Sequence, residues 1–310
     1  MSTFAVLPHA GSMENPLIAL SDELAAIVAN AGQSVVTVHG RPRIASSGVV
    51  WKPGVIVTAE HTLRRDEDLR ITLPDGSTVP AEIAGRDSGT DIAILRAETG
   101  EAAAAIVKES TALKAGHLVL AIGRSQDTGV SAALGVISSL SGPWHTWRGG
   151  KLDQFVRLDV GLYPGASGGA IVGVDGSLVG IATGGLSRTS PLAIPVETVA
   201  RVAAALLDKG HIARGYLGVG LQPVTLPEHL KQKTGLIVLS VEPDGPAAQA
   251  GVVIGDVLLS LDGSPVSDTG DVQAVLGAEN VGKAVRLSIV RGGSLAELTI
   301  TIGERPRRRV

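Results

Sequence analysis

The feature that most constrains the fold is a long series of short β-type runs between about residues 34 and 185. Val, Ile and Leu dominate these runs, and no helical spacing separates one run from the next. Asp75-Gly76 and Asp175-Gly176 stand between runs and predict two-residue hairpin turns. The chain holds 40 Gly among 310 residues but only two Phe, two Tyr and three Trp, so aliphatic side chains must fill its core. Closely spaced antiparallel strands of this kind predict a mainly β fold of barrels or a sandwich.

Two helical segments and a second β-rich region complete the predicted organisation. Apolar residues recur at helical spacing in residues 17–32 and 196–208, and a Lys-Gly pair ends the second of these helices. Another β-rich segment, long enough for a small domain, runs from residue 216 to about residue 303. We therefore place a domain boundary near residues 210–215. The basic segment at the end of the chain is interpreted as a solvated tail.

Composition excludes several classes of protein. The absence of Cys excludes disulfides, Cys-ligated metal sites and a thiol nucleophile. A formal net charge of −3 provides no global basic field for nucleic acid. No apolar run approaches the roughly 18 residues of a membrane-spanning helix. The N-terminus has neither the charged nor the apolar region of a signal peptide, so we expect a cytoplasmic chain as written, or one from which an export segment was removed.

The string GASGG at residues 165–169 carries the first chemical signal. Serine nucleophiles need an exposed hydroxyl beside backbone N–H groups that point at a developing oxyanion, and Gly leaves room for the turn and the substrate. If the turn has the expected shape, the N–H groups of Gly165 and Ser167 converge. On its own, however, the string favours an ordinary hairpin turn in a Gly-rich chain.

A serine nucleophile needs a base, and the base needs an orienting carboxylate. His61 follows the β run GVIVTAE, and Asp91 opens the apolar run IAIL. Taken singly, His61 is more simply interpreted as an exposed His after a strand, and Asp91 as an Asp that caps a turn. Their order favours catalysis: 30 residues separate His61 from Asp91, 76 separate Asp91 from Ser167, and all three stand at strand edges.

With these segments in this order, the chain resembles the trypsin-like serine proteases of the HtrA (Deg) family. VTAEHTL, TDIAIL and GASGGAIV match the family's segments around its catalytic His, Asp and Ser, and the resemblance covers about residues 17–305. It implies a mainly β fold, with a chymotrypsin-like double β-barrel protease domain in residues 1–212, including the N-terminal helical segment. A PDZ domain follows in residues 213–305, and residues 306–310 form the basic tail.

The resemblance also implies a mechanism. Ser167 attacks a peptide carbonyl, His61 accepts its proton and Asp91 orients the imidazole. The N–H groups of Gly165 and Ser167 form the oxyanion hole. The reaction requires no cofactor and no metal.

The same resemblance predicts the specificity pocket. The residue six before the nucleophile lies at the base of the pocket in this fold, and here it is Gly161, which offers no acidic group to Lys or Arg. Leu162 and the run Leu192, Ala193 and Ile194 are expected to line the pocket. We therefore predict small or medium aliphatic side chains before the scissile bond.

Three departures from the family pattern bear on activity. Glu60 and Ala166 stand where the family usually has Asn. The Glu60 carboxylate either faces solvent or disturbs the neighbouring His61. The loop before the nucleophile strand lacks the family's Arg after Leu-Gly, and Arg148 is the only Arg in that loop.

The second β-rich segment resembles a single PDZ domain. Its YLGV string matches the loop that receives a peptide C-terminal carboxylate through successive backbone N–H groups, and residues 268–276 match the groove-lining helix. The alternative is a small β domain used only for packing. The predicted peptide-binding residues are Tyr216, Leu217, Gly218, Val219, Val272 and Leu276.

Two functions remain open at this point. One is a serine endopeptidase that cleaves unfolded or misfolded proteins in protein quality control, and the other is a catalytically silent peptide-binding or chaperone protein. The implied partners are unfolded or misfolded polypeptides and peptide C-termini at the PDZ groove, with no nucleic acid. The resemblance also implies a homotrimer or higher multiple, for which Phe4 is the only aromatic residue near the N-terminus. The resemblance also shifts the expected location of the protein to the periplasm or cell envelope if an export segment was removed.

Overall fold

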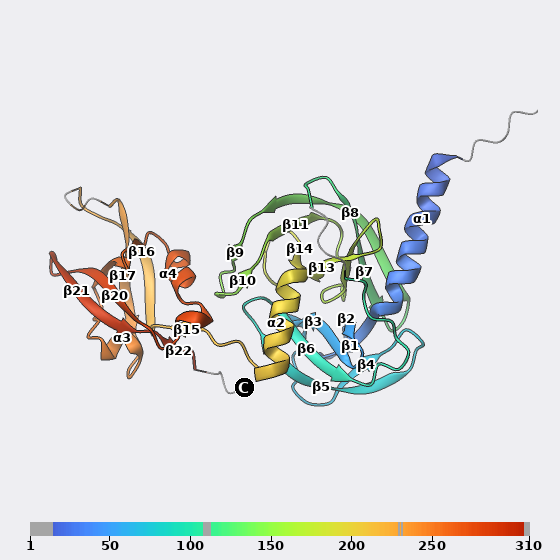
Figure 1. Ribbon diagram of the computed structural model, residues 1–310, viewed down its shortest axis with the longest axis horizontal. Helices are drawn as coiled ribbons and strands as arrows, with labels where there is room; N and C mark the ends of the chain where they lie inside the picture. Colours follow the sequence, from blue (N-terminus) through green and yellow to red (C-terminus); the bar gives the residue numbers. More distant parts are fainter. Residues whose placement is uncertain (1–14, 108–112, 229, 231, 307–310) are drawn as a thin grey trace, which may run out of the picture.

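Two closed β-barrels and a third, separate β domain make up the structure (Figure 1). The computed structural model describes residues 15–107, 113–228, 230 and 232–306. Phe4 and residues 307–310 of the basic tail lie outside these described residues. The mainly β fold with a double barrel that the sequence predicts is confirmed.

The first barrel follows helix α1 (Pro16–Ala31) and closes in the strand order β1-β2-β3-β6-β5-β4. Asn15 caps α1, because its side chain accepts a hydrogen bond from the Leu17 amide at 3.0 Å. No residue of α1 is buried, and the helix projects from the barrels (Figure 1). The strands are β1 (Val35–His39), β2 (Ser46–Lys52), β3 (Val55–Ala59), β4 (Leu69–Thr72), β5 (Thr78–Asp87) and β6 (Ile92–Ala97).

The second barrel closes in the order β11-β14-β13-β12-β7-β8, and β9 pairs with β10 outside it. Helix α2 (Val196–Lys209) follows its last strand and ends at Gly210, whose φ of +73° suits a left-handed cap. The predicted Lys-Gly end of this helix is confirmed. The strands are β7 (Leu118–Ser125), β8 (Gly129–Ser141), β9 (Trp144–His145), β10 (Lys151–Leu152), β11 (Phe155–Asp159), β12 (Ala170–Gly173), β13 (Leu178–Thr183) and β14 (Leu192–Pro195).

The alternating direction of the side chains along the strands divides the core of the two barrels into three clusters. In β1, Val36 packs in a cluster confined to the first barrel, whereas its neighbour Val35 packs in a larger cluster that includes residues of both barrels and of α2. We call this larger cluster the shared cluster; its members include Val35, Ile92, Leu120, Ile194 and Val199. A further cluster is confined to the second barrel. Because successive strand residues face opposite sides, each barrel fills its own interior and still packs on the other.

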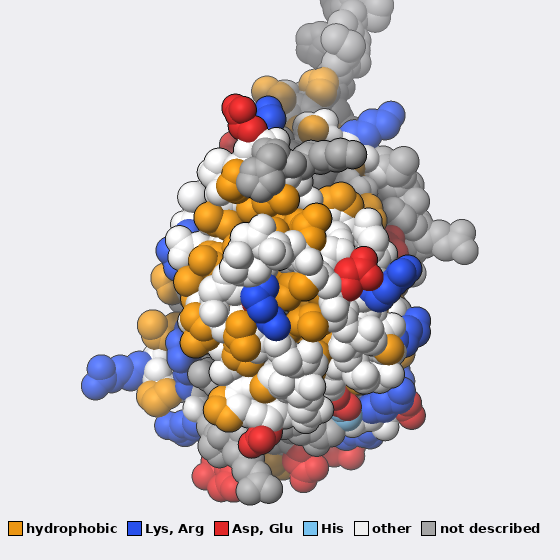
Figure 2. Space-filling view, turned by 90° about the vertical axis from the view of Figure 1, so that its left-hand side faces the viewer, with side chains coloured by type: hydrophobic (Ala, Val, Ile, Leu, Met, Phe, Trp, Pro, Cys, Tyr) orange, Lys and Arg blue, Asp and Glu red, His pale blue; other side chains and the backbone are white. Residues whose placement is uncertain are grey.

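The third domain is a sheet in the order β16-β17-β18-β20-β21, so β16 is an edge strand, and β19 pairs with β18. Seen from this end of the molecule, small groups of apolar side chains alternate with polar and charged ones (Figure 2). Its elements are β15 (Gly215–Tyr216), β16 (Val219–Thr225), β17 (Thr234–Val241), α3 (Pro246–Gln249), β18 (Val257–Leu261), β19 (Ser264–Pro265), α4 (Thr269–Val275), β20 (Ala284–Arg291), β21 (Ser294–Thr301) and β22 (Gly303–Glu304).

The described helices are all too short or too polar to span a lipid bilayer.

Candidate active site

His61 and Asp91 meet at the ends of two neighbouring strands. His61 lies in the 3₁₀ helix η2 (Glu60–Thr62) that follows β3, and Asp91 directly precedes β6. β3 pairs with β6 so that Ala59 stands opposite Ile92, which brings the two side chains together. The imidazole Nδ1 lies 2.8 Å from Asp91 Oδ2 and 3.0 Å from Oδ1, and the His61 amide donates to Oδ1 at 2.8 Å. Asp91 is fully buried, so this contact is shielded from water.

Two residues that the sequence analysis did not predict complete the surroundings of this pair. Thr183, the last residue of β13, donates its hydroxyl to Asp91 Oδ2 at 2.5 Å. A Cβ on Gly185 would lie 2.5 Å from His61 Nδ1 and 2.9 Å from Asp91 Oδ2, so only Gly fits against the pair. The pattern Thr-Gly-Gly after a β run is the one sequence signal for this segment.

Ser167 reaches the same segment from the other side. Its hydroxyl oxygen accepts a hydrogen bond from the Gly184 amide at 3.4 Å, one residue before the Gly that packs on His61. Within the described part of the chain, no direct hydrogen bond joins His61 to Ser167. The structure therefore gathers all three predicted triad residues around Gly184 and Gly185.

Ser47 of β2 holds the turn that carries Ser167, and the sequence analysis did not predict this role. The Ser47 hydroxyl donates to the Gly165 carbonyl at 2.8 Å, and the Ser47 amide donates to the Ser167 carbonyl at 3.1 Å. Gly168 has a φ of +87°, and a Cβ there would lie 2.2 Å from the Ser47 carbonyl oxygen. The turn is thus tied to the first barrel, although Ser167 is followed by a strand of the second.

The amides of Gly165 and Ser167 differ from their neighbours in the same turn. Ala166, Gly168 and Gly169 all donate backbone hydrogen bonds at 2.8–2.9 Å. The Gly165 and Ser167 amides donate none to the described residues. Gly165 holds a φ of +95°, which favours Gly. The Ala166 side chain, which replaces the family's Asn, is buried.

Glu60, beside the catalytic candidate His61, is largely withdrawn from solvent. Its side chain is 18% exposed, and its carboxylate lies 3.8 Å from Arg86 Nη1. Burial, and then the nearby Asp91 carboxylate, raise the pKa of Glu60 above its usual value, and Arg86 offsets them only in part. The first of the two alternatives for this residue, a solvent-facing carboxylate, does not describe the structure.

This raised pKa predicts a pH-dependent effect of Glu60→Gln. A carboxyl group whose folded-state pKa is raised contributes stability below its unfolded pKa of 4.5, and that contribution is lost as pH rises through the folded pKa. As pH rises from about 4 to about 8, the wild type loses this contribution and Glu60→Gln does not. The free energy of unfolding of Glu60→Gln should therefore increase relative to that of the wild type over this range. Urea denaturation at both pH values measures this difference. Glu98→Gln, which changes an exposed carboxylate, is the control, and an equal gain in both variants would contradict the prediction.

Three of the predicted pocket residues lie on β14 (Leu192–Pro195), and they divide between the two faces of this strand. Leu192 and Ile194 pack in the shared cluster, whereas Ala193 between them packs inside the second barrel, where the half-buried Leu162 also lies. Gly161 is exposed. Because strand residues alternate in direction, the structure brings Leu162 and Ala193 into one cluster and directs Leu192 and Ile194 away from it.

The predicted peptide-binding residues of the third domain surround one cavity of about 210 Å³. The cavity lies between β16 and α4, and all six predicted residues line it: Tyr216, Leu217, Gly218, Val219, Val272 and Leu276. Sequence reasoning missed the four charged residues that also line this cavity: Arg148, Arg214, Glu242 and Arg305.

The cavity is bordered by residues of the third domain, such as Tyr216, and by Arg148 from the second barrel's loop before β11. The Tyr216 hydroxyl donates to the Glu242 carboxylate. Partial burial and this hydrogen bond raise the pKa of Tyr216 to about 12. Arg148, the single Arg of the loop before β11, stacks on the Trp147 ring with its guanidinium carbon 4.5 Å from the ring centre. Because Arg148 also lines the cavity, this loop before β11 reaches the groove of the third domain.

Comparison with known proteins agrees with this architecture. A trypsin-like peptidase domain matches residues 46–181, and a PDZ domain matches residues 215–302. A probable periplasmic serine endoprotease DegP-like from Pseudomonas fulva is 34% identical over 85% of this chain and 56% of its own length. Protease Do-like 1, chloroplastic, from Arabidopsis thaliana is 32% identical over 86% of this chain and 65% of its own length. The chain thus spans a little over half the length of the DegP-like relatives.

Solved structures of similar proteins cover almost the whole chain. The HtrA-type protease AlgW with decapeptide superposes with a TM-score of 0.74 at 26% identity, over 91% of this chain and 99% of its own. A serine endoprotease from Yersinia pestis superposes with a TM-score of 0.72 at 29% identity, over 91% of this chain and 98% of its own. The chain belongs to the HtrA (Deg) family and consists of a trypsin-like serine protease domain followed by a PDZ domain.

Proposed function

We propose that this protein is a serine endopeptidase that cleaves unfolded or misfolded polypeptides in protein quality control. The observation that carries the proposal is the grouping of His61, Asp91 and Ser167 around Gly184 and Gly185. A buried carboxylate holds His61 Nδ1, and this arrangement leaves Nε2 as the nitrogen that can accept a proton.

The chemical steps follow from the positions of these groups. Ser167 Oγ attacks the peptide carbonyl carbon while its proton passes to His61 Nε2, and the carbonyl oxygen becomes an oxyanion. The amides of Gly165 and Ser167, which donate to none of the described residues, donate to this oxyanion. His61 then protonates the leaving amine as the carbon–nitrogen bond breaks. A water molecule, deprotonated by His61, then attacks the acyl carbon, and His61 returns this proton to Ser167 Oγ as the bond between the acyl carbon and Oγ breaks.

We propose that the pocket prefers small or medium aliphatic side chains before the scissile bond. The support is the absence of an acidic residue at Gly161 and the packing of the apolar pair Leu162 and Ala193 in one cluster of the second barrel. Leu192 and Ile194 act in this proposal only as buried supports. Mass spectrometry of casein fragments measures the preference, and strong cleavage after Lys or Arg would contradict it.

The PDZ groove is proposed to bind peptide C-termini. β16 is an edge strand whose free side faces α4, so an extended peptide can add to the sheet there. Support comes from the solved structures of the HtrA-type protease AlgW with a decapeptide and with a tripeptide, which superpose over 91% of this chain. Isothermal titration with short peptides that differ only in a free or amidated C-terminus tests this role, and equal affinity would contradict it.

Casein proteolysis by the full chain tests the proposed activity. The wild type should cleave casein, with or without added C-terminal peptides, and Ser167→Ala should lose this activity. Ser240→Ala changes an exposed serine of the PDZ domain and should retain it. Peptide binding without any cleavage would instead support the catalytically silent chaperone.

We further propose a homotrimer or higher multiple formed through the protease domain. Helix α1 exposes Leu17, Ile18 and Leu20 to 43–73%, an apolar surface of the kind that assembly covers. Multi-angle light scattering measures the mass, and a monomer at all concentrations would contradict the proposal.

A periplasmic or envelope location is proposed from the names of the DegP-like relatives, and cell fractionation tests it.

A further inference from the structure

The loop of residues 40–45, which joins β1 to β2, runs beside the turn that carries Ser167. A Cβ on Gly165 would lie 2.8 Å from the Ala45 carbonyl oxygen, so the end of the loop packs directly on the candidate oxyanion hole. At the start of the loop, the Gly40 carbonyl accepts a hydrogen bond from the Arg64 amide at 2.7 Å. Because Arg64 closely follows His61 in the chain, the loop extends from the candidate oxyanion hole to the segment of His61.

Three arginines stand along this loop and at its tie to the His61 segment, and we call Arg41, Arg43 and Arg64 the basic rim. Arg41 Nε donates to the Ile44 carbonyl at 2.8 Å and closes the loop on itself. Arg43 holds a φ of +70°, which a residue with a side chain keeps only where its surroundings fix it. Arg43 and Ile44 are both exposed at the tip of the loop, and Arg64 is exposed beside it. The loop therefore presents guanidinium groups next to the candidate active site in a fixed conformation.

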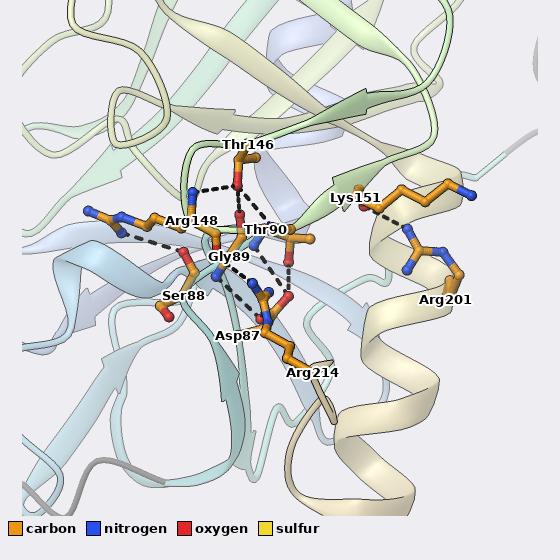
Figure 3. Close-up of polar contacts among 10 residues, drawn as sticks. Asp87, Ser88, Gly89, Thr90, Thr146, Arg148, Lys151, Arg201 and Arg214 are labelled. Atoms are coloured by element: carbon orange, nitrogen blue, oxygen red, sulfur yellow. Dashed lines mark hydrogen bonds and ion pairs between the residues drawn. The ribbon is translucent and has the colours of Figure 1, made fainter. Parts of the chain in front are cut away.

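The basic rim carries positive charge without a countercharge. In the part of the chain that the structure describes, none of its three guanidinium groups forms an ion pair. Figure 3 shows the contrast with Arg214, which lies between α2 and β15 and donates to the buried Asp87 carboxylate. The acidic run at residues 66–68 lines a separate hollow together with Arg86. The rim is therefore a positive surface that an acidic ligand would complement.

The proposed mechanism puts the basic rim on the leaving-group side of the active site. His61 protonates the leaving amine in that mechanism, so the chain that begins with this amine departs past His61. The side chain before the scissile bond is assigned to Leu162 and Ala193, which pack in the second barrel. The loop of residues 40–45 belongs to the first barrel and connects the turn of the oxyanion hole to the His61 segment. In this mechanism, the residues after the scissile bond therefore pass along the basic rim.

We propose that the basic rim binds acidic side chains that follow the scissile bond, so that the protein cleaves preferentially before segments rich in Asp and Glu. The inference rests on the proposed function and adds a second determinant of specificity to it. Guanidinium groups bind carboxylates through paired, charge-assisted hydrogen bonds. An acidic substrate brings the countercharge that the rim lacks, and the fixed conformation of the loop limits the entropy that is lost on binding.

Matched internally quenched peptides test this preference with the full chain. Both peptides carry Val before the scissile bond and an amidated C-terminus, which keeps any PDZ contribution equal. One has Asp-Glu and the other Asn-Gln at the second and third positions after the bond. Wild type should cleave the acidic peptide with a kcat/KM about 5- to 10-fold higher, the size expected for two exposed Arg–carboxylate pairs. Added salt should reduce this ratio, because exposed charges are screened.

Variants of the basic rim should abolish the preference for the acidic peptide. In the double variant Arg43→Asn, Arg64→Gln, the ratio of the two kcat/KM values should fall to about twofold or less. Asn is chosen at position 43 because it tolerates the left-handed backbone there. The double variant Arg96→Gln, Arg286→Gln removes two exposed arginines of β6 and β20 and should keep the wild-type ratio. Each ratio compares two peptides on one variant, so a general loss of activity cancels.

Equal cleavage of the two peptides by wild type would overturn the inference, as would a ratio that persists in the rim variant or falls equally in the control. If the rim variant fails to fold, Arg64→Gln alone decides by the same ratio. If wild type cleaves neither peptide, the proposed function fails, and fluorescence anisotropy of the two labelled peptides still tests the rim. Tighter, rim-dependent binding of the acidic peptide would then support the inference, and equal binding would overturn it. Rim-dependent binding of a uridine oligonucleotide with no preference between the peptides would assign the surface to nucleic acid and overturn it as well.

Discussion

Asn in place of Asp91 is expected to lower kcat on the order of 10⁴-fold while the chain stays folded. The Asp91 carboxylate accepts hydrogen bonds from the His61 amide, His61 Nδ1 and the Thr183 hydroxyl. An Asn side chain has one acceptor oxygen and presents an NH₂ group in place of the other. If that NH₂ group faces His61, Nδ1 becomes the acceptor, the proton moves to Nε2, and His61 can no longer take a proton from Ser167.

Steady-state hydrolysis of a small ester substrate by Asp91→Asn measures this loss, with thermal unfolding as the check on folding. Asp127→Asn, an exposed residue in the turn between β7 and β8, is the matched control and should keep wild-type kcat. A folded Asp91→Asn variant that retained a tenth or more of wild-type kcat would contradict the assignment of Asp91.

Ala in place of Gly185 is expected to produce the second large effect, a loss of kcat of about 100-fold or more. The added Cβ would lie 2.5 Å from His61 Nδ1 and 2.9 Å from Asp91 Oδ2. Because Asp91 holds the imidazole, the ring cannot move away without breaking the Nδ1 contact. Either the segment after β13 or the His61 ring must shift, and both positions matter for proton transfer.

The adjacent residue provides a matched comparison for this prediction. A Cβ on Gly184 would lie 3.9 Å from Ser167 Oγ, an ordinary contact distance. Gly184→Ala should therefore lose far less kcat than Gly185→Ala in the same ester assay. Equal losses in the two variants would show that the close approach to His61 is not what requires Gly at position 185.

The local sequence identifies the candidate site residues more readily than the residues that support them. His61, Asp91 and Ser167 each follow or precede a β run, and such positions are visible along the chain. Ser47 and Thr183 support them from strands far away in sequence. Neither has a local signal that separates it from other strand Ser and Thr residues, so only the closed barrels reveal them.

The pocket and the interdomain contacts show two different limits of sequence reasoning. The run Leu192, Ala193 and Ile194 alternates between two clusters, and the period-2 rule for strands already indicates that a whole run cannot line one pocket. Arg214 was not predicted for another reason: its partner Asp87 is 127 residues away, and no property of a linker Arg identifies a buried carboxylate in another domain.

The sequence analysis predicted groove residues within the third domain, and it did not predict the residues of the preceding part of the chain that also line the cavity. The six predicted residues meet around one cavity because the YLGV loop leads into β16 and α4 packs against this strand. Arg148 approaches from the protease loop, where the sequence analysis noted it only as a departure from the family pattern.

Covalent labelling of Ser167 tests the central claim most directly. A fluorophosphonate probe reacts with a serine that a neighbouring base activates, and peptide mass spectrometry locates the modified residue. We predict modification of Ser167 in the wild type, none in Ser167→Ala and strongly slowed modification in His61→Ala. Wild-type chain that remains unmodified at Ser167 under all conditions, including saturating C-terminal peptides, would contradict the account of this protein as a serine protease.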